Sequence, residues 1–239
     1  MNDNKISAQK KIIVALDTKD TDQALDMASK LSNAAAFKLG LEFFCANGPE
    51  GIRILTKKGL KVFLDLKLHD IPNTIEGAIK ASVLINPFMM TVHISGGRSM
   101  LQRSMSTIKE CCEKKSLKRP LIVGVSVLTS IDEEDFNALG LSGRIEDQVK
   151  RLADLALNSG LDGIVCSAKE LKGLRKHIDK NFIIVTPGIR PKWGERNDQK
   201  RIMTPTEAIK LGANYLVIGR PITGAKDPAL AFEKLCSEV

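Results

Sequence analysis

Residues 62–74, VFLDLKLHDIPNT, place charged side chains at the end of an apolar run. Asp65 and Lys67 are two positions apart, so in a β-strand they point to the same face while Leu64, Leu66 and Leu68 point to the other. Asp70 follows where the run ends. A carboxylate held beside an ammonium group can transfer a proton or stabilise a developing charge. The alternative is a structural ion pair, but desolvation often cancels the Coulomb gain of such pairs. We therefore interpret these charges as a functional site.

Two further segments have residue types suited to anion binding. They are TPGIRP (186–191) and IGRPI (218–222). Gly188 and Gly219 allow backbone N–H groups to approach an oxyanion, and Arg190 and Arg220 carry the planar fork that matches phosphate. The polar stretch between them, 192–205, is longer than a simple connector and is typical of a lid.

The elements that must position these residues are short apolar runs alternating with segments of helical spacing. The helical segments include 22–32 and 145–160, the second ending on Gly160 as a helix terminator. The apolar runs are 11–17, 35–40, 61–67, 89–94, 121–128, 162–168, 182–189 and 214–221. Such alternation predicts parallel strands covered by helices.

Eight strand–helix units in 239 residues predict an α/β protein with a (β/α)8 TIM barrel as a single domain, 1–239. Residues 1–10 are expected to form a polar N-terminal tail, and about 190–205 the phosphate-side lid. An open doubly wound sheet is the alternative, but the GxGxxG expected after its first strand is missing.

A barrel of this type carries its active site at the carboxyl ends of the strands. Polar residues occur at or near the ends of the first four predicted strands: Asp17, Lys38, Asp65 with Lys67, and His93. The loops after the seventh and eighth strands often bind phosphate in barrels. The charged residues and the two segments suited to anion binding are therefore expected to lie at the same end of the barrel. The charged side chains would point into its interior.

The amino-acid composition argues against a membrane-spanning, a secreted and a nucleic-acid-binding protein. The chain has 43% hydrophobic and 27% charged residues, no apolar run near the roughly 20 residues of a membrane span, and a polar N-terminus without a secretory signal. The five cysteines form no CxxC pair and are expected to be reduced, buried thiols of a cytoplasmic protein. The net charge of +8 is dispersed. A nucleic-acid-binding protein, the alternative suggested by that charge, would bind in a salt-sensitive way but has no need of Asp65 and Lys67 inside a barrel.

LDLKLHDIPNT matches the DxKxxDIPNT signature of the orotidine 5′-phosphate decarboxylase family. VALD (14–17), FKLG (37–40), VLTS (127–130), TPGIRP and IGRPI follow that family's order and spacing, so the chain resembles it from about residue 12 to 222. The resemblance implies a carbon–carbon lyase that converts orotidine 5′-phosphate to UMP and CO2, the last step of de novo pyrimidine nucleotide biosynthesis. It implies no cofactor, no metal, and neither nucleic acid nor membrane as a partner.

The resemblance also implies roles for individual residues. Lys67 would protonate C6 of the pyrimidine, and Asp65 would lie beside the departing carboxylate, in an alternating array of Lys38, Asp65, Lys67 and Asp70. Asp70, Ile71 and Thr74 would reach the neighbouring subunit's site, which makes the protein a homodimer. The expected substrate contacts are Asp17 and Lys38 with the ribose, His93 near it, and Thr129 or Ser130 with the pyrimidine. Gln199, Gly219 and Arg220 would hold the phosphate, with Arg190 closing from the lid, and Pro187 is a further expected substrate contact.

The nearest rival is another phosphate-binding barrel enzyme, such as 3-keto-L-gulonate 6-phosphate decarboxylase. That enzyme shares a DxKxxD skeleton but uses a divalent metal to stabilise an enediolate. LHDIPNT argues against it. Activity that survives a chelator separates the two.

Overall fold

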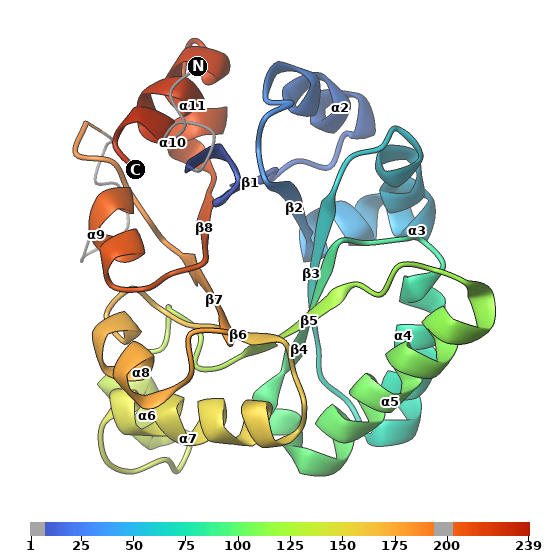
Figure 1. The fold of residues 1–239 in the computed structure, drawn as a ribbon, viewed down its shortest axis with the longest axis vertical. Coiled ribbons are helices and arrows are strands. Elements are labelled where there is room, and N and C mark those ends of the chain that lie inside the picture. The colour runs from blue at the N-terminus through green and yellow to red at the C-terminus, as the bar shows by residue number, and fades with distance from the viewer. Residues whose placement is uncertain (1–7, 194–202) are drawn as a thin grey trace.

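The computed structural model describes residues 8–193 and 203–239 (Figure 1). Across these residues eight parallel strands pair in chain order, and β8 returns to pair with β1, so the sheet closes into a barrel. The strands are β1 (Ile12–Ala15), β2 (Ala36–Gly40), β3 (Val62–Leu68), β4 (Met89–His93), β5 (Leu121–Val125), β6 (Gly163–Val165), β7 (Ile183–Pro187) and β8 (Tyr215–Ile218). The predicted (β/α)8 barrel is confirmed, and the open sheet is excluded.

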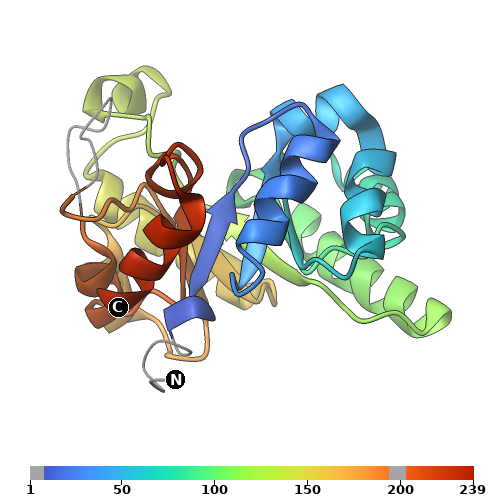
Figure 2. The same ribbon diagram turned by 90° about the horizontal axis from the view of Figure 1, so that it is seen from above.

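Helices follow the strands and lie outside the ring of strands (Figures 1 and 2). They are α2 (Thr21–Lys30), α3 (Leu41–Lys57), α4 (Pro72–Val83), α5 (Gly97–Lys115), α6 (Glu133–Ala138), α7 (Ile145–Asn158), α8 (Leu171–His177), α9 (Pro205–Lys210), α10 (Arg220–Thr223) and α11 (Pro228–Ser237), with a short 3-10 turn η1 (Ile94–Gly96) after β4. Gly160 has a φ of 81° just beyond α7, so it terminates that helix as predicted.

Several helices begin where a side chain satisfies their free backbone N–H groups. Asp20, Asp132 and Asp227 accept such bonds at the starts of α2, α6 and α11. Thr204 and Glu207 form a reciprocal capping box at the start of α9. The chain after the predicted lid is therefore fixed from Thr204 onward.

The strands bury two separate sets of apolar side chains. The inner set fills the barrel and consists of Ile13, Ala15, Ala36, Phe63, Met89, Val123, Val185 and Val217. The outer set lies between barrel and helices, and it includes the alternate strand residues, such as Ile12 and Val14 on β1 and Leu64 on β3. Because side chains alternate along each strand, this division fixes which residues point into the barrel.

Two expectations need correction. Ala8 and Gln9, assigned to a polar tail, are helical and buried. The cysteines are all free thiols, but Cys45 is exposed and Cys111 half-buried, because their helices α3 and α5 turn those positions outward. Among the described residues, no helix combines the length and apolar character that crossing a membrane requires.

Candidate functional site

The centre of the candidate site is Asp65, which is 8% exposed near the carboxyl end of β3. It lies two residues after Phe63, which belongs to the inner set, while Leu66 and Leu68 pack against the outer set. The prediction that the charged face of this strand lines the barrel interior is therefore confirmed. Burial in an apolar barrel is costly for a carboxylate unless it is paired.

Asp65 is paired with two lysines. Lys67 Nζ lies 2.8 Å from Asp65 Oδ2 and donates a hydrogen bond to it, and Lys38 Nζ lies 3.7 Å from the same oxygen. Lys38 Nζ is also 3.7 Å from Asp17 Oδ1. The result is an alternating row of charges, Asp17–Lys38–Asp65–Lys67, that spans the ends of β1, β2 and β3. Each charge has an opposite neighbour, so the row is held in place before any ligand binds.

Lys67 interrupts the regular strand. Leu64 pairs with Met90 and Leu68 with Val92, so an advance of four residues along β3 matches an advance of only two residues along β4. Lys67 has a φ of 50°, in the left-handed region that non-glycine residues rarely adopt. The expected proximity of Asp65 and Lys67 is confirmed, but a bulge brings them together rather than an unbroken alternation.

Thr91 on β4 was not predicted as a site residue. Its hydroxyl accepts a hydrogen bond from the Lys67 backbone N–H at 2.8 Å and donates one to Asp65 Oδ1 at 3.0 Å. A sequence signal did exist, because Thr91 is a polar residue two positions before His93, on the same strand face.

Asp70 does not join the row of charges within one chain. It is exposed, its Oδ1 accepts a hydrogen bond from the Ile71 backbone N–H, and it forms no ion pair with any described residue. Ile71 is 66% exposed and Thr74 is also exposed, at the corner between β3 and α4. Within one chain the second carboxylate of the row is Asp17. The contribution of Asp70 to a neighbouring subunit's site stays a prediction.

A cavity of about 180 Å³ adjoins these charges at the carboxyl ends of the strands. It is lined by Lys38, Phe63, Asp65, Lys67, Val125, Val127, Leu128, Thr129, Val165, Cys166, Pro187 and Val217. Thr129 and Pro187 were predicted to contact a ligand, whereas Ser130 is exposed on the same loop and outside the lining. The apolar walls and the charged floor suit a small, partly polar ligand.

A second, larger hollow of about 620 Å³ lies outside the barrel, between α5 and the segment entering β5. It is lined by Met105, Ser106, Lys109, Cys112, Glu113, Leu117 and Arg119. Arg119 there is occupied by Asp162, with hydrogen bonds of 2.6 and 2.9 Å. The smaller cavity is the candidate active site because the converging charges lie there.

The residues predicted to bind an anion lie at the ends of β7 and β8. Gly188 has a φ of 76°, which favours glycine at that turn. A Cβ on Gly219 would lie 3.3 Å from Ala15 Cβ and 3.5 Å from Asp17 Oδ2, so the end of β8 passes close to the row of charges. Arg220 is exposed and begins α10 directly after that glycine. A short helix after the eighth strand is a frequent phosphate site in barrels.

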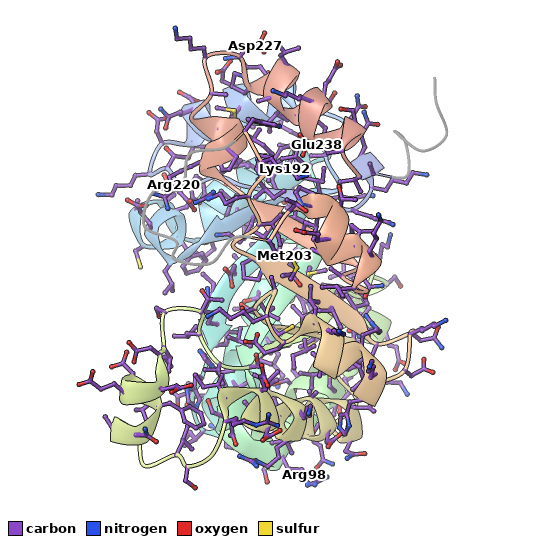
Figure 3. The ribbon with its side chains drawn as sticks, turned by 90° about the vertical axis from the view of Figure 1, so that its left-hand side faces the viewer. Arg98, Lys192, Met203, Arg220, Asp227 and Glu238 are labelled. Atoms are coloured by element: carbon purple, nitrogen blue, oxygen red, sulfur yellow. The ribbon has the colours of Figure 1, made fainter. Side chains whose placement is uncertain are left out.

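Some of the residues that were predicted to bind the phosphate do not follow this arrangement. Gln199 and residues 194–202 of the predicted lid lie outside the described residues. Arg190, expected to close from the lid, is 5% exposed, and its backbone N–H donates to the Met203 carbonyl at 3.2 Å. Lys192 and Met203 lie on either side of the undescribed segment; Figure 3 shows Lys192 in the upper part of the view, with Arg220 and Glu238, and Met203 near the middle. Trp193 Nε1 donates to Glu238 Oε1 at 2.6 Å, which anchors the first flank to the end of the chain.

His93 is half-buried at the end of β4, and its Nδ1 is buried without a hydrogen-bond partner among the described residues. Its ring centroid is 5.4 Å from that of His69. Burial, with His69 and Lys67 nearby, lowers the pKa of His93 below its ordinary value. The site therefore favours the neutral imidazole. The contact of His93 with a ribose stays a prediction. No group of three or more His, Cys, Asp or Glu able to hold a metal occurs within the described residues.

Glu170, directly before α8, is half-buried near Cys166 of the cavity wall. Burial raises the pKa of Glu170 from 4.5 to about 7 and also raises the pKa of the Cys166 thiol. An unfolded glutamate ionises at its ordinary pKa, so the folded state loses stability as pH rises from about 4.5 to about 7. Above about pH 7 the loss of stability caused by burying this carboxylate no longer changes with pH.

We expect Glu170→Gln to have little effect on stability near pH 5 and to stabilise the protein relative to wild type near pH 8, because the amide carries no charge to desolvate. Thermal unfolding of both proteins at the two pH values measures this, with Glu110→Gln on the exposed face of α5 as the control. A melting-temperature difference that does not change with pH contradicts the assignment.

Comparison with known proteins gives consistent matches. The model of the orotidine 5′-phosphate decarboxylase / HUMPS family matches residues 10–235. The chain is 45% identical over 237 residues to the orotidine 5′-phosphate decarboxylase of Moorella thermoacetica, covering 98% of this chain and 94% of that protein. It is 46% identical over 230 residues to that of Vibrio cholerae, covering 96% and 98%. The solved structure of the Lactobacillus acidophilus enzyme of that name superposes with a TM-score of 0.84 at 36% identity, covering 95% of this chain and 98% of that chain.

Proposed function

The chain belongs to the orotidine 5′-phosphate decarboxylase / HUMPS family, whose curated relatives are carbon–carbon lyases of pyrimidine biosynthesis, and we propose that its barrel mouth decarboxylates orotidine 5′-phosphate to UMP by means of preset charges. The observation that carries the proposal is the ion pair of Asp65 and Lys67 on the floor of the cavity, 2.8 Å apart and backed by Lys38.

The chemistry requires such charges. When the bond from C6 to the carboxylate breaks, the electron pair stays on C6 and CO2 leaves. C6 is a vinyl-type carbon without a conjugated electron sink, so its negative charge must be stabilised by groups already in place. The Lys67 ammonium group, at the cavity and partnered by Asp65, stabilises that charge and then donates a proton from Nζ to C6.

Asp65 has a separate role in the proposal. It lies beside the substrate carboxylate, so two negative charges are close together in the ground state. Loss of CO2 relieves that repulsion, which contributes to lowering the barrier. Because Asp65 is fixed by Lys38, Lys67 and Thr91, it cannot easily turn away.

The ribose and phosphate bind at the other side of the mouth. Asp17 has 65% of its side chain exposed, and with Lys38 it is available to ribose hydroxyls. Gly219 and Arg220, next to Asp17, hold the phosphate, together with Arg190 and Gln199. Contacts far from C6 supply binding energy that positions the pyrimidine against Lys67.

The functional unit in this proposal is a homodimer. The exposed corner of Asp70, Ile71 and Thr74 presents a large apolar side chain beside a carboxylate without an ion-pair partner among the described residues. Inserted into a partner's mouth, the corner would bury Ile71 and add Asp70 next to Lys67, which restores the alternation of charges. The five free thiols agree with a reducing compartment, the cytoplasm, and one domain remains the proposed organisation.

The substrate is tested by following the ultraviolet absorbance of orotidine 5′-phosphate with purified protein in excess EDTA. The proposal expects rapid conversion to UMP. No conversion by folded, dimeric protein would rule the activity out, and sugar phosphates with added magnesium would then test the metal-dependent rival.

A further inference from the structure

We infer that Thr91 is a positioning residue for Lys67 and Asp65, and that its hydroxyl sets the geometry of the catalytic ion pair. The inference rests on the proposed function, because it assigns a role within that site. Thr91 is 1% exposed and is absent from the cavity lining, so it acts through its two neighbours and not on a ligand.

The first step concerns the backbone of Lys67. The bulge between Leu64 and Leu68 removes the regular ladder between β3 and β4 at this point. The Lys67 N–H therefore needs another acceptor, and the Thr91 hydroxyl provides it at 2.8 Å. This bond fixes the residue at its φ of 50°, a conformation that a lysine does not hold without support.

The second step concerns the direction of the hydroxyl proton. A backbone N–H can only donate, so the Thr91 oxygen accepts from Lys67, and its own proton is left for Asp65 Oδ1 at 3.0 Å. Asp65 Oδ1 is thereby occupied. Oδ2 is left to face Lys67 Nζ at 2.8 Å and Lys38 Nζ at 3.7 Å.

One hydroxyl thus determines two things at once: where the backbone of Lys67 lies and which carboxylate oxygen meets its ammonium group. A purely structural threonine would affect stability alone. A positioning threonine affects the chemical step, because a proton donor displaced by about an ångström loses much of its effect while the ribose and phosphate contacts are unchanged.

The experiment compares Thr91→Val, which keeps the shape and removes the hydroxyl, with Thr91→Ser, which keeps the hydroxyl. Thr107→Val is the matched control, at a threonine 3% exposed on α5 whose hydroxyl makes no hydrogen bond among the described residues. We expect Thr91→Val to lower kcat roughly 10- to 100-fold, the effect of one lost bond to a charged group, with KM changed less than about threefold. Serine should restore kcat to within about fivefold of wild type, and Thr107→Val should match wild type.

A Thr91→Val enzyme with wild-type kcat overturns the inference while leaving the proposed function intact, whereas an inactive wild type overturns the function itself. A crystal structure of Thr91→Val gives a readout that does not depend on activity. We expect Lys67 to leave the left-handed region or its contact with Asp65 to lengthen. A structure in which both the Lys67 backbone and the ion pair are unchanged overturns the inference. If Thr91→Val does not fold, Thr91→Ala replaces it in both measurements, with the same expected and contrary results.

Discussion

Lys67→Ala is expected to abolish turnover of orotidine 5′-phosphate, with kcat at least about 10⁴-fold below wild type. The variant loses both the proton donor and the positive charge nearest to C6, and each contribution is typically worth about 10²-fold or more. Steady-state absorbance assays measure the loss. The Lys67 side chain is 31% exposed at the cavity, so its removal leaves no void in the barrel core.

The matched control is Lys61→Ala, at an exposed lysine just before β3, at the opposite end of the same strand from the candidate site. It should retain wild-type kcat. Circular dichroism and UMP binding should show that Lys67→Ala is folded and still holds the ribose and phosphate. A variant that is folded and keeps more than about a hundredth of wild-type kcat contradicts the role of Lys67 as the proton donor.

Asp70→Asn is also expected to reduce turnover severely, although Asp70 contacts no lysine among the described residues of its own chain. The reason is the proposed shared site, in which Asp70 of one subunit completes the charge row of the other. Mixing the inactive Lys67→Ala and Asp70→Asn proteins then produces mixed dimers with one intact site each. Equal mixing should restore about a quarter of the wild-type rate, since half of the dimers are mixed and one of their two sites is intact in a twofold-symmetric dimer.

The control is each variant alone, taken through the same subunit exchange without denaturant. Mass spectrometry of differently tagged subunits establishes that mixed dimers have formed. If mixed dimers are present and activity does not return, Asp70 acts within its own chain or not at all, and the shared site is wrong.

The barrel and the location of its charges could be predicted from local patterns. Short apolar runs alternating with amphipathic segments require parallel strands covered by helices, and alternation along β3 places Asp65 on the same face as Phe63. Both are properties of neighbouring residues, so one sequence suffices to predict them.

The features missed depend on contacts between segments distant in the chain. The bulge at Lys67 arises from the register of β3 against β4, and Thr91 becomes important because that register brings its hydroxyl to Asp65, 26 positions away. The burial of Arg190 likewise could not be predicted from its neighbours in sequence, and its backbone N–H donates to Met203, 13 positions away.

The central claim is that preset charges stabilise a carbanion at C6 and that Lys67 carries the proton. Microscopic reversibility provides the most direct test, because an enzyme that protonates C6 must also remove that proton from the product. UMP incubated with the protein in D2O should lose its C6–H signal in the proton NMR spectrum with wild type, and should keep it with Lys67→Ala. Exchange at the wild-type rate in Lys67→Ala, or none in a wild type that turns over orotidine 5′-phosphate, would contradict the account.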